Sequence, residues 1–376
     1  MTEKNVQSMR QSNLELFRII TMILIIAHHY VVNSGLTNMD GPIAYNPLSF
    51  HSIFLLLWGA WGKIGINCFV LFSGYFMSVK NITLKKYLKL ICEVMFYRIV
   101  IALIFWITGY EKVSIRGIIK VFMLIRNLSN GFTSAYLIFF LFIPFLNILV
   151  HHMTEKQHIR LLLLVSFAYI FLGTFSPVTS VKMNYASWFM VLYLISSYIR
   201  LYPKKIFDKT RAWGMLAISC IIVSCVSVIV CTWIGTKLNQ TIYYHFVSDS
   251  NTFLAVLTGI SSFMFFKNIR IPQNKYINAV AATTFGVLCI HANSDTMRQW
   301  LWQDTLKNID YYYSSTGYIH AIVSVLGIFF ICSLIDYIRI RFIEKPFFHI
   351  VDNMIECIAS RFANIEKRFF EKYMIN

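Results

Sequence analysis

The stretch "ELFRIITMILIIAHHYVV", residues 15–32, decides the fold class, because it is long and apolar enough to cross a bilayer as a helix. It nevertheless carries Glu15 and Arg18 near its start and His28 and His29 towards its end. Ionisable groups are costly inside a bilayer, and those found there commonly serve a transport pathway or a site. The stretch is therefore predicted to be a membrane helix that carries chemistry.

The rest of the chain has the same apolar character. Of its 376 residues, 57% are hydrophobic and 14% are charged, and the mean hydropathy is +0.61. Soluble domains carry about 25% charged residues. Because apolar runs long enough to span recur to the end of the chain, we predict an all-α, polytopic membrane protein of about ten transmembrane helices. The predicted spans are 14–34, 64–79, 91–109, 134–150, 159–176, 185–200, 212–234, 251–266, 278–296 and 317–338.

The first span is predicted to remain in the mature protein. It is too long and too rich in histidine for the core of a signal peptide, and no small-residue cleavage site follows it.

The net charge of +17 follows membrane topology. If the N-terminus is cytosolic, the basic runs "KNITLKKYLK", "RLYPKKIFDKTR" and "KNIRIPQNK" all lie between spans on the cytosolic side. Arg18 and Arg98, which lie within spans, are assigned to the same nearer face. The excess of lysine and arginine on that side obeys the positive-inside rule and places both termini in the cytosol. We therefore expect a lipid bilayer, and no nucleic acid, as a partner.

The chain divides into a cytosolic N-terminal tail (1–13), a transmembrane domain (14–346) and a cytosolic tail (347–376). Glu344 and Pro346 end the last span, where topology and a helix stop explain them as well as a supporting role does. After Pro346, apolar residues follow a 4-3-4-3-4 spacing with basic residues between them. This pattern predicts an amphipathic helix lying on the anionic inner leaflet.

The eight cysteines indicate neither a disulfide framework nor a zinc site. Most fall inside predicted spans, and no Cys-x-x-Cys occurs. We expect small buried hydrophobes and no metal.

Arg18 and His29 share one face of the first helix. Eleven steps of about 100° come within about 20° of three full turns and separate the two residues by about 16 Å. His28 points about 80° away from that face, and Glu15 is spaced to pair with Arg18. The alternative is that Arg18 snorkels to the inner headgroups and the histidines are interfacial. The alignment of both groups favours a site.

An Arg followed ten residues later by a His resembles the signature of the membrane acyltransferase 3 family. The lead-in "NLELFRIITMILIIAHH" is similar to the opening of that family, with Glu15 at its acidic position. Further segments resemble later parts of the family in the correct order. They are "GINCFVLFSGYFM" (65–77), "KKYLKL" (85–90), "YLIFFLFIPFLN" (136–147), "TTFGVLCIHAN" (283–293) and "FIEKPF" (342–347).

The resemblance implies an integral O-acyltransferase of the bacterial plasma membrane. Such an enzyme moves an acyl group, expected to be acetyl, from cytosolic acetyl-CoA or another acyl-CoA to a sugar hydroxyl. The expected acceptor is a cell-surface polysaccharide or a lipid-linked precursor. His29 is the expected catalytic residue, either as a base only or also as a transient carrier of the acyl group, and Arg18 is expected to guide the donor to it.

Other residues receive roles from the same resemblance. The cluster of Lys85, Lys86 and Lys89 would bind the phosphates of the donor, although ordinary topology also explains it. His291, Asn293 and Tyr75 are the candidates for the acceptor side, and His291 could equally be a satisfied interhelical histidine.

A transporter that exports a polysaccharide or a small anion is the competing function, because ten spans suit it equally. Transporters often have helices broken by Gly or Pro in corresponding halves, and no such pairing is visible here. A catalytically inactive membrane protein is the third possibility, but the Arg18 and His29 pair is intact.

Overall fold

The computed structural model describes residues 11–80, 82–129, 131–175 and 184–353. Within these residues the regular structure is helical, without a strand, and seven helical stretches are long and apolar enough to cross a membrane. The all-α, multi-pass prediction is therefore confirmed. The count of ten spans and the cytosolic position of both ends stay predictions. The seven stretches are Ser12–Val32, Phe50–Met77, Leu84–Ile107, Phe132–His152, Glu155–Phe175, Thr210–Leu238 and Gly317–Asn353.

Most predicted spans correspond to helices. The predicted spans 185–200 and 251–266 correspond to α10 and α12, which are shorter than the seven stretches above. In chain order the helices of the described residues are α1 (Ser12–Val32), α2 (Pro42–Tyr45), α3 (Phe50–Gly59), α4 (Gly62–Met77), α5 (Leu84–Ile107), α6 (Ile115–Phe122), α7 (Phe132–His152), α8 (Glu155–Ser166), η1 (Phe167–Phe171), α9 (Leu172–Phe175), α10 (Tyr185–Leu201), η2 (Lys205–Asp208), α11 (Thr210–Leu238), α12 (Phe253–Asn268), α13 (Lys275–Ala282), α14 (Thr284–His291), α15 (Asp295–Gln299), η3 (Trp300–Thr305), α16 (Asn308–Tyr312), α17 (Gly317–Arg339) and η4 (Ile340–Glu344).

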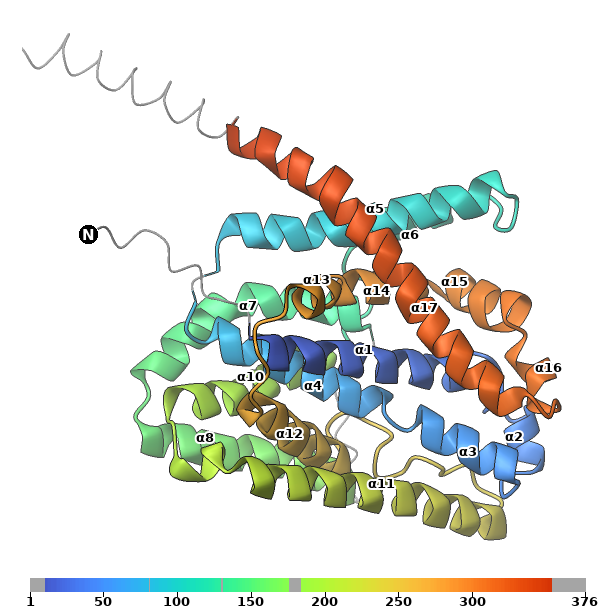
Figure 1. Ribbon diagram of the computed structural model, residues 1–376, viewed down its shortest axis with the longest axis horizontal. Helices are drawn as coiled ribbons and strands as arrows, with labels where there is room; N and C mark the ends of the chain where they lie inside the picture. The colour runs from blue at the N-terminus through green and yellow to red at the C-terminus, as the bar shows by residue number, and fades with distance from the viewer. Residues whose placement is uncertain (1–10, 81, 130, 176–183, 354–376) are drawn as a thin grey trace, which may run out of the picture.

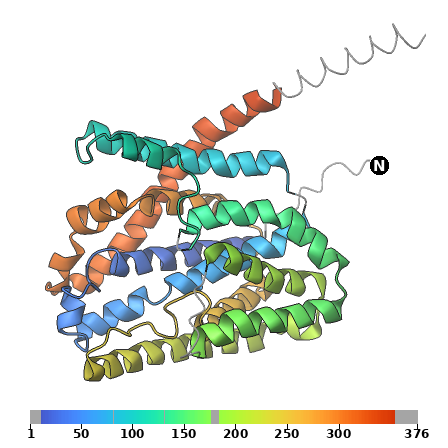
Figure 2. The same cartoon turned by 180° about the vertical axis from the view of Figure 1, so that it is seen from behind.

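Helix α1 lies in the middle of the bundle (Figure 1). It packs against α3 and α4 on one side and against α13, α14 and α17 on another. Seen from behind, α5 and α11 still lie at opposite edges of the bundle, with α1 between them (Figure 2). The polar groups of α1 therefore face other helices and not lipid.

The outer helices present apolar side chains to their surroundings. Leu163 on α8, Ile222 on α11 and Phe330 on α17 are each more than half exposed. Such exposure would be costly in water but suits a hydrocarbon solvent. The pattern agrees with a chain that spans a bilayer.

The ninth predicted span, 278–296, is not one helix. Helix α13 ends at Ala282 and α14 begins at Thr284. The hydroxyls of Thr283 and Thr284 donate to backbone carbonyls three residues earlier, at 2.8 and 2.9 Å. Such bonds compete with the regular helical ladder and favour a bend. The break leaves α14 as a short, fully buried helix that ends in His291.

The predicted stop at Pro346 is wrong. The helix runs on to Asn353 through the widened turn η4, which ends two residues before this proline. A widened turn accommodates a residue that lacks an N–H and would otherwise clash with the preceding turn. The predicted amphipathic tail lies mostly outside the described residues and stays a prediction.

Gly74 of α4 allows α4 to pack closely against α10. A Cβ at this position would collide with Ser196 Oγ and lie 3.1 Å from the Cα of Tyr193. We expect Gly74→Ala to destabilise the fold by about 1–3 kcal/mol, because overpacking outweighs the gain in helix propensity. The measurement is the apparent melting temperature in detergent. Gly327→Ala in α17 is the control, since its Cβ would meet no atom within 4 Å, and equal melting temperatures would contradict the prediction.

Candidate active site

The ring of His29 on α1 is held by His291 at the end of α14. The distance from His29 Nδ1 to His291 Nε2 is 3.0 Å. His291 is fully buried, and its own Nδ1 lies 2.6 Å from the carbonyl oxygen of Val287. The break before α14 and the packing of α14 against α1 thus bring together two histidines that are 262 residues apart.

These contacts assign the protons of the neutral pair. A carbonyl oxygen only accepts, so Nδ1 of His291 must carry the hydrogen that it donates to Val287. The Nε2 of His291 is then an acceptor, and Nδ1 of His29 donates to it. The remaining nitrogen, Nε2 of His29, keeps its lone pair. His29 therefore has the tautomer that a general base requires.

The neighbouring His28 is fixed differently. Its Nδ1 lies 2.6 Å from the carbonyl oxygen of Gly59 and donates to it, which ties α1 to α3. A Cβ on Gly62 would collide with the His28 ring, so the glycine provides room for it.

A cavity of about 610 Å³ adjoins His29 and is mostly polar in its lining. Asn293 lies on its wall and donates through Nδ2 to the carbonyl oxygen of Cys289, 2.9 Å away. Four cationic side chains also line this cavity: Lys63, Arg98, Arg126 and Arg298. The assignment of Arg98 to the same face as Arg18 is wrong, because Arg98 lies on the His29 side.

Arg18 points into the bundle. Its Nη1 donates to Glu15 at 3.0 Å and its Nη2 to the hydroxyl of Thr284, also at 3.0 Å. The guanidinium lies over the ring of Phe72, 4.8 Å from its centroid. The predicted pairing with Glu15 is confirmed, and the alternative that Arg18 snorkels away from the bundle does not hold.

Arg18 lines a second cavity, of about 310 Å³, together with Lys86 and Lys89. The two cavities lie on either side of an aromatic partition. Phe69, Tyr136 and Phe285 line the Arg18 cavity, and Phe132, whose ring stacks on Tyr136 with centroids 5.6 Å apart, lines the His29 cavity. A long, thin ligand reaching from Arg18 to His29 would have to pass these rings.

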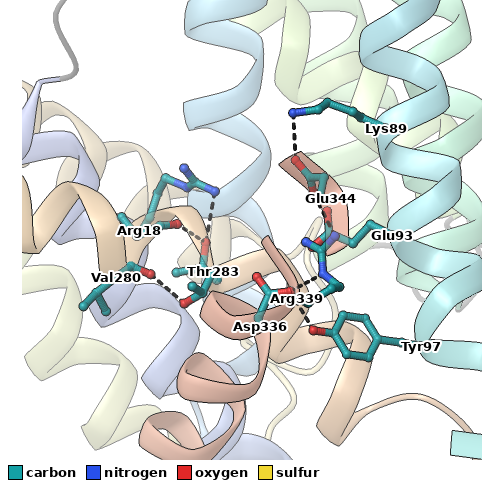
Figure 3. A network of polar contacts seen from close by, with 11 residues as sticks. Arg18, Lys89, Glu93, Tyr97, Val280, Thr283, Asp336, Arg339 and Glu344 are labelled. Carbon is teal, nitrogen blue, oxygen red and sulfur yellow. Dashed lines mark hydrogen bonds and ion pairs between the residues drawn. The ribbon is translucent and has the colours of Figure 1, made fainter. Parts of the chain in front are cut away.

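A buried ionic cluster lies beside the Arg18 cavity (Figure 3). Arg339 of α17 is at its centre and binds Glu93, Asp336 and Glu344 at 3.0, 2.7 and 2.8 Å. Lys89 binds the other oxygen of Glu344 at 2.7 Å. The cluster therefore joins α5 to α17. Helix α14 packs closely against it at Gly286, where a Cβ would collide with Asp336. We read it as the clamp that holds the Arg18 cavity together.

Two predicted residues lie elsewhere. Lys85 forms an ion pair with Asp352 at 2.6 Å and does not line the Arg18 cavity. The hydroxyl of Tyr75 accepts a hydrogen bond from Arg200 at 3.0 Å, away from the His29 cavity. Their proposed roles in binding gain no support from these positions.

Most of the charged residues around the site were not predicted from the sequence. Asp336 and Arg339 had a usable signal, since two opposite charges one turn apart at the end of an apolar span commonly pair within a bundle. Lys63, Arg98 and Arg126 gave no such signal, because they come from separate segments that meet only in the fold. Among the described residues, no group of three or more His, Cys, Asp or Glu is arranged to hold a metal ion.

Comparison with known proteins gives one match. A family model of the acyltransferase 3 type, described as an acyltransferase domain, matches residues 11–337. No curated protein and no solved structure gives a significant match.

The ionic cluster makes a prediction about stability. Arg339→Leu would leave the buried carboxylate of Asp336 and the partly buried carboxylates of Glu93 and Glu344 without their main counter-charge, which costs about 3–5 kcal/mol. We expect a marked fall in the apparent melting temperature in detergent. Arg341→Leu is the matched control, since Arg341 lies two residues away, is exposed and forms no ion pair in the described structure. A similar small effect of both substitutions would show that the cluster is not a clamp.

Proposed function

This chain belongs to the acyltransferase 3 family of membrane proteins, and from that premise we propose that it acylates a sugar hydroxyl of a cell-surface polysaccharide or of its lipid-linked precursor. Membership makes it a membrane acyltransferase in general terms. The donor, acetyl-CoA or another cytosolic acyl-CoA, and the acceptor are the proposed part, as is the bacterial plasma membrane. The observation that carries the proposal is the His29 ring, whose tautomer is fixed by His291 and which borders a polar cavity.

The Arg18 cavity suits an anionic donor. Lys86, Lys89 and Arg18 line it, and phosphates favour such groups electrostatically. Lys89 is also bound to Glu344, so a donor phosphate would share or displace that carboxylate. Beside this cavity, a larger one of about 960 Å³ is lined by Lys89, Lys275 and Lys345, which leaves room for the nucleotide end of CoA.

The geometry of α1 suits the rest of the donor. Arg18 and His29 are separated by about 16 Å along the helix axis, comparable with the length of a pantetheine arm. The phosphates would stay near Arg18 while the thioester passes the aromatic partition to reach His29. Because the rings of Phe69, Tyr136 and Phe132 touch in this structure, the donor must displace them to pass.

The reaction follows from these positions. Nε2 of His29 takes the proton of the sugar hydroxyl as the oxygen attacks the thioester carbonyl. The tetrahedral intermediate then collapses, the C–S bond breaks, and the CoA sulfur leaves with the electron pair. The imidazolium of His29 returns the proton to that sulfur. His291 keeps the ring oriented throughout and is a positioning residue.

Substitution of His29 tests the enzyme against the transporter. We expect His29→Ala to abolish acylation of the surface glycan without stopping its export, because the base is lost while the bundle stays intact. The measurement is the acyl mass on the glycan, by mass spectrometry, in cells with matched expression. His152→Ala controls for loss of an imidazole, since His152 is exposed at the end of α7 and, within the described residues, its ring hydrogen-bonds to Ile148 of the same helix. Export lost in step with acylation would favour a transporter.

His291 allows a finer test of the proton assignment. Gln in its place keeps an acceptor oxygen for His29 Nδ1, whereas Leu removes the acceptor. We expect His291→Leu to lower kcat by about 100-fold or more and His291→Gln to retain more activity. The measurement is kcat across pH with purified protein, where a purely structural role would lower stability without moving the limbs of the pH profile. Equal activity of the two variants would contradict the assignment.

A further inference from the structure

The His29 cavity carries an excess of positive charge. Its wall holds Lys63, Arg98, Arg126 and Arg298 but, within the described residues, only one carboxylate, that of Asp295. The outer side of a membrane protein is normally depleted in lysine and arginine. The positive-inside rule therefore does not account for four cations around a cavity on the side predicted to face outward.

Two of these cations already have a carboxylate within ion-pair distance. Arg298 binds Asp295 at 2.7 Å. Lys63 donates to the hydroxyl of Tyr185 at 2.7 Å and has Asp249 at 3.9 Å.

The other two, Arg98 and Arg126, form no ion pair in the described part of the chain. The guanidinium of Arg98 donates to the backbone carbonyls of Met123 and Leu124, which position it without neutralising its charge. Both arginines also border a neighbouring cavity of about 130 Å³, where Glu111 lies on the wall but pairs with neither of them.

Two uncompensated guanidiniums on one wall repel each other, and the repulsion is relieved when an anion binds between them. A guanidinium presents paired N–H donors that match the two oxygens of a carboxylate or phosphate. Arg98 is held in place by the loop carbonyls, whereas the exposed side chain of Arg126 forms no hydrogen bond or ion pair within the described residues. The wall is therefore arranged to receive an anion that the protein itself does not supply.

From this arrangement we infer that Arg98 and Arg126 bind an anionic group of the acceptor, a phosphate or a carboxylate, beside His29. The inference that the anion belongs to an acceptor rests on the proposed function, whereas the anion site itself does not. The acceptor is then a glycan with an acidic sugar or a lipid-linked sugar with a phosphate group. The donor phosphates occupy the other side of the aromatic partition, near Arg18, so the two anions do not compete.

Binding of small anions tests the site without any turnover. The full chain in lipid nanodiscs is titrated with inorganic pyrophosphate and with glucuronate, with coenzyme A present at saturation. We expect at least one anion to bind, and Arg126→Gln to weaken that binding by at least tenfold. Arg116→Gln is the matched control, because Arg116 is an exposed arginine of the nearby α6 and lines neither cavity.

Equal binding to wild type and Arg126→Gln would overturn the inference. Competition between coenzyme A and the anion in wild type would also overturn it, because the His29 cavity would then be the donor site.

Acceptor kinetics identify the source of the anion. The acceptors are three alkyl-linked sugars that differ in charge: a neutral glucoside, a glucuronide and a glucosyl diphosphate. We expect one anionic acceptor to be preferred, and Arg126→Gln to raise its KM at least tenfold while the KM for the acyl-CoA stays unchanged. Preference for the glucuronide indicates an acidic sugar, and preference for the diphosphate indicates a lipid-linked precursor. Use of the neutral glucoside as efficiently as both anionic acceptors would overturn the inference, and so would an unchanged KM for the anionic acceptors in Arg126→Gln.

The anion site and the proposed function can be disproved separately. If no acceptor is acylated but Arg126→Gln still loses anion binding, the proposed function falls and the anion site stands. If acylation proceeds but Arg126→Gln binds anions and uses acceptors as wild type does, the anion site falls alone.

Discussion

The hydrogen bond between His29 and His291 is the contact on which the rest of the site depends. It has an ordinary length of 3.0 Å, and one partner is fully buried and anchored to a backbone carbonyl of its own helix. That chain of bonds leaves only one nitrogen of His29 with a free lone pair. A base whose tautomer is fixed before the substrate arrives need not reorganise during the reaction. Helix α14 is therefore as much a part of the candidate site as α1.

The same short helix also holds the other end of the site. Thr284, at the start of α14, accepts the hydrogen bond from Arg18, and His291, at its end, receives His29. Seven residues of helix rise about 10 Å, and eleven rise about 16 Å. The long side chain of Arg18 makes up much of the difference. The break between α13 and α14 thus allows the pair of α1 and α14 to set the distance between the Arg18 cavity and His29.

Charge is distributed around this pair in two ways. On the Arg18 side the cations are matched by carboxylates, as in the cluster of Arg339 with Glu93 and Glu344. On the His29 side, Arg98 contacts only backbone carbonyls through its guanidinium, and Arg126 forms no side-chain hydrogen bond within the described residues. Neither arginine forms an ion pair with a carboxylate of the described residues. Matched clusters hold helices together in a low-dielectric interior. Unmatched cations cost free energy unless a ligand supplies the opposite charge, and the two sides therefore suit different roles.

The sequence by itself determined the fold class, the face that Arg18 and His29 share, and the pairing of Glu15 with Arg18. Each depends on helical periodicity or on hydropathy, which are local properties of the chain. Only the tertiary structure decided that His291 orients His29, that Arg98 lies on the His29 side, that Tyr75 lies elsewhere and that the helix continues past Pro346. Those outcomes depend on which helix faces meet, on where a helix breaks and on how a turn widens. These outcomes depend on packing between segments that are far apart in the chain, as with His29 and His291, which are 262 residues apart. Local sequence patterns do not predict such contacts.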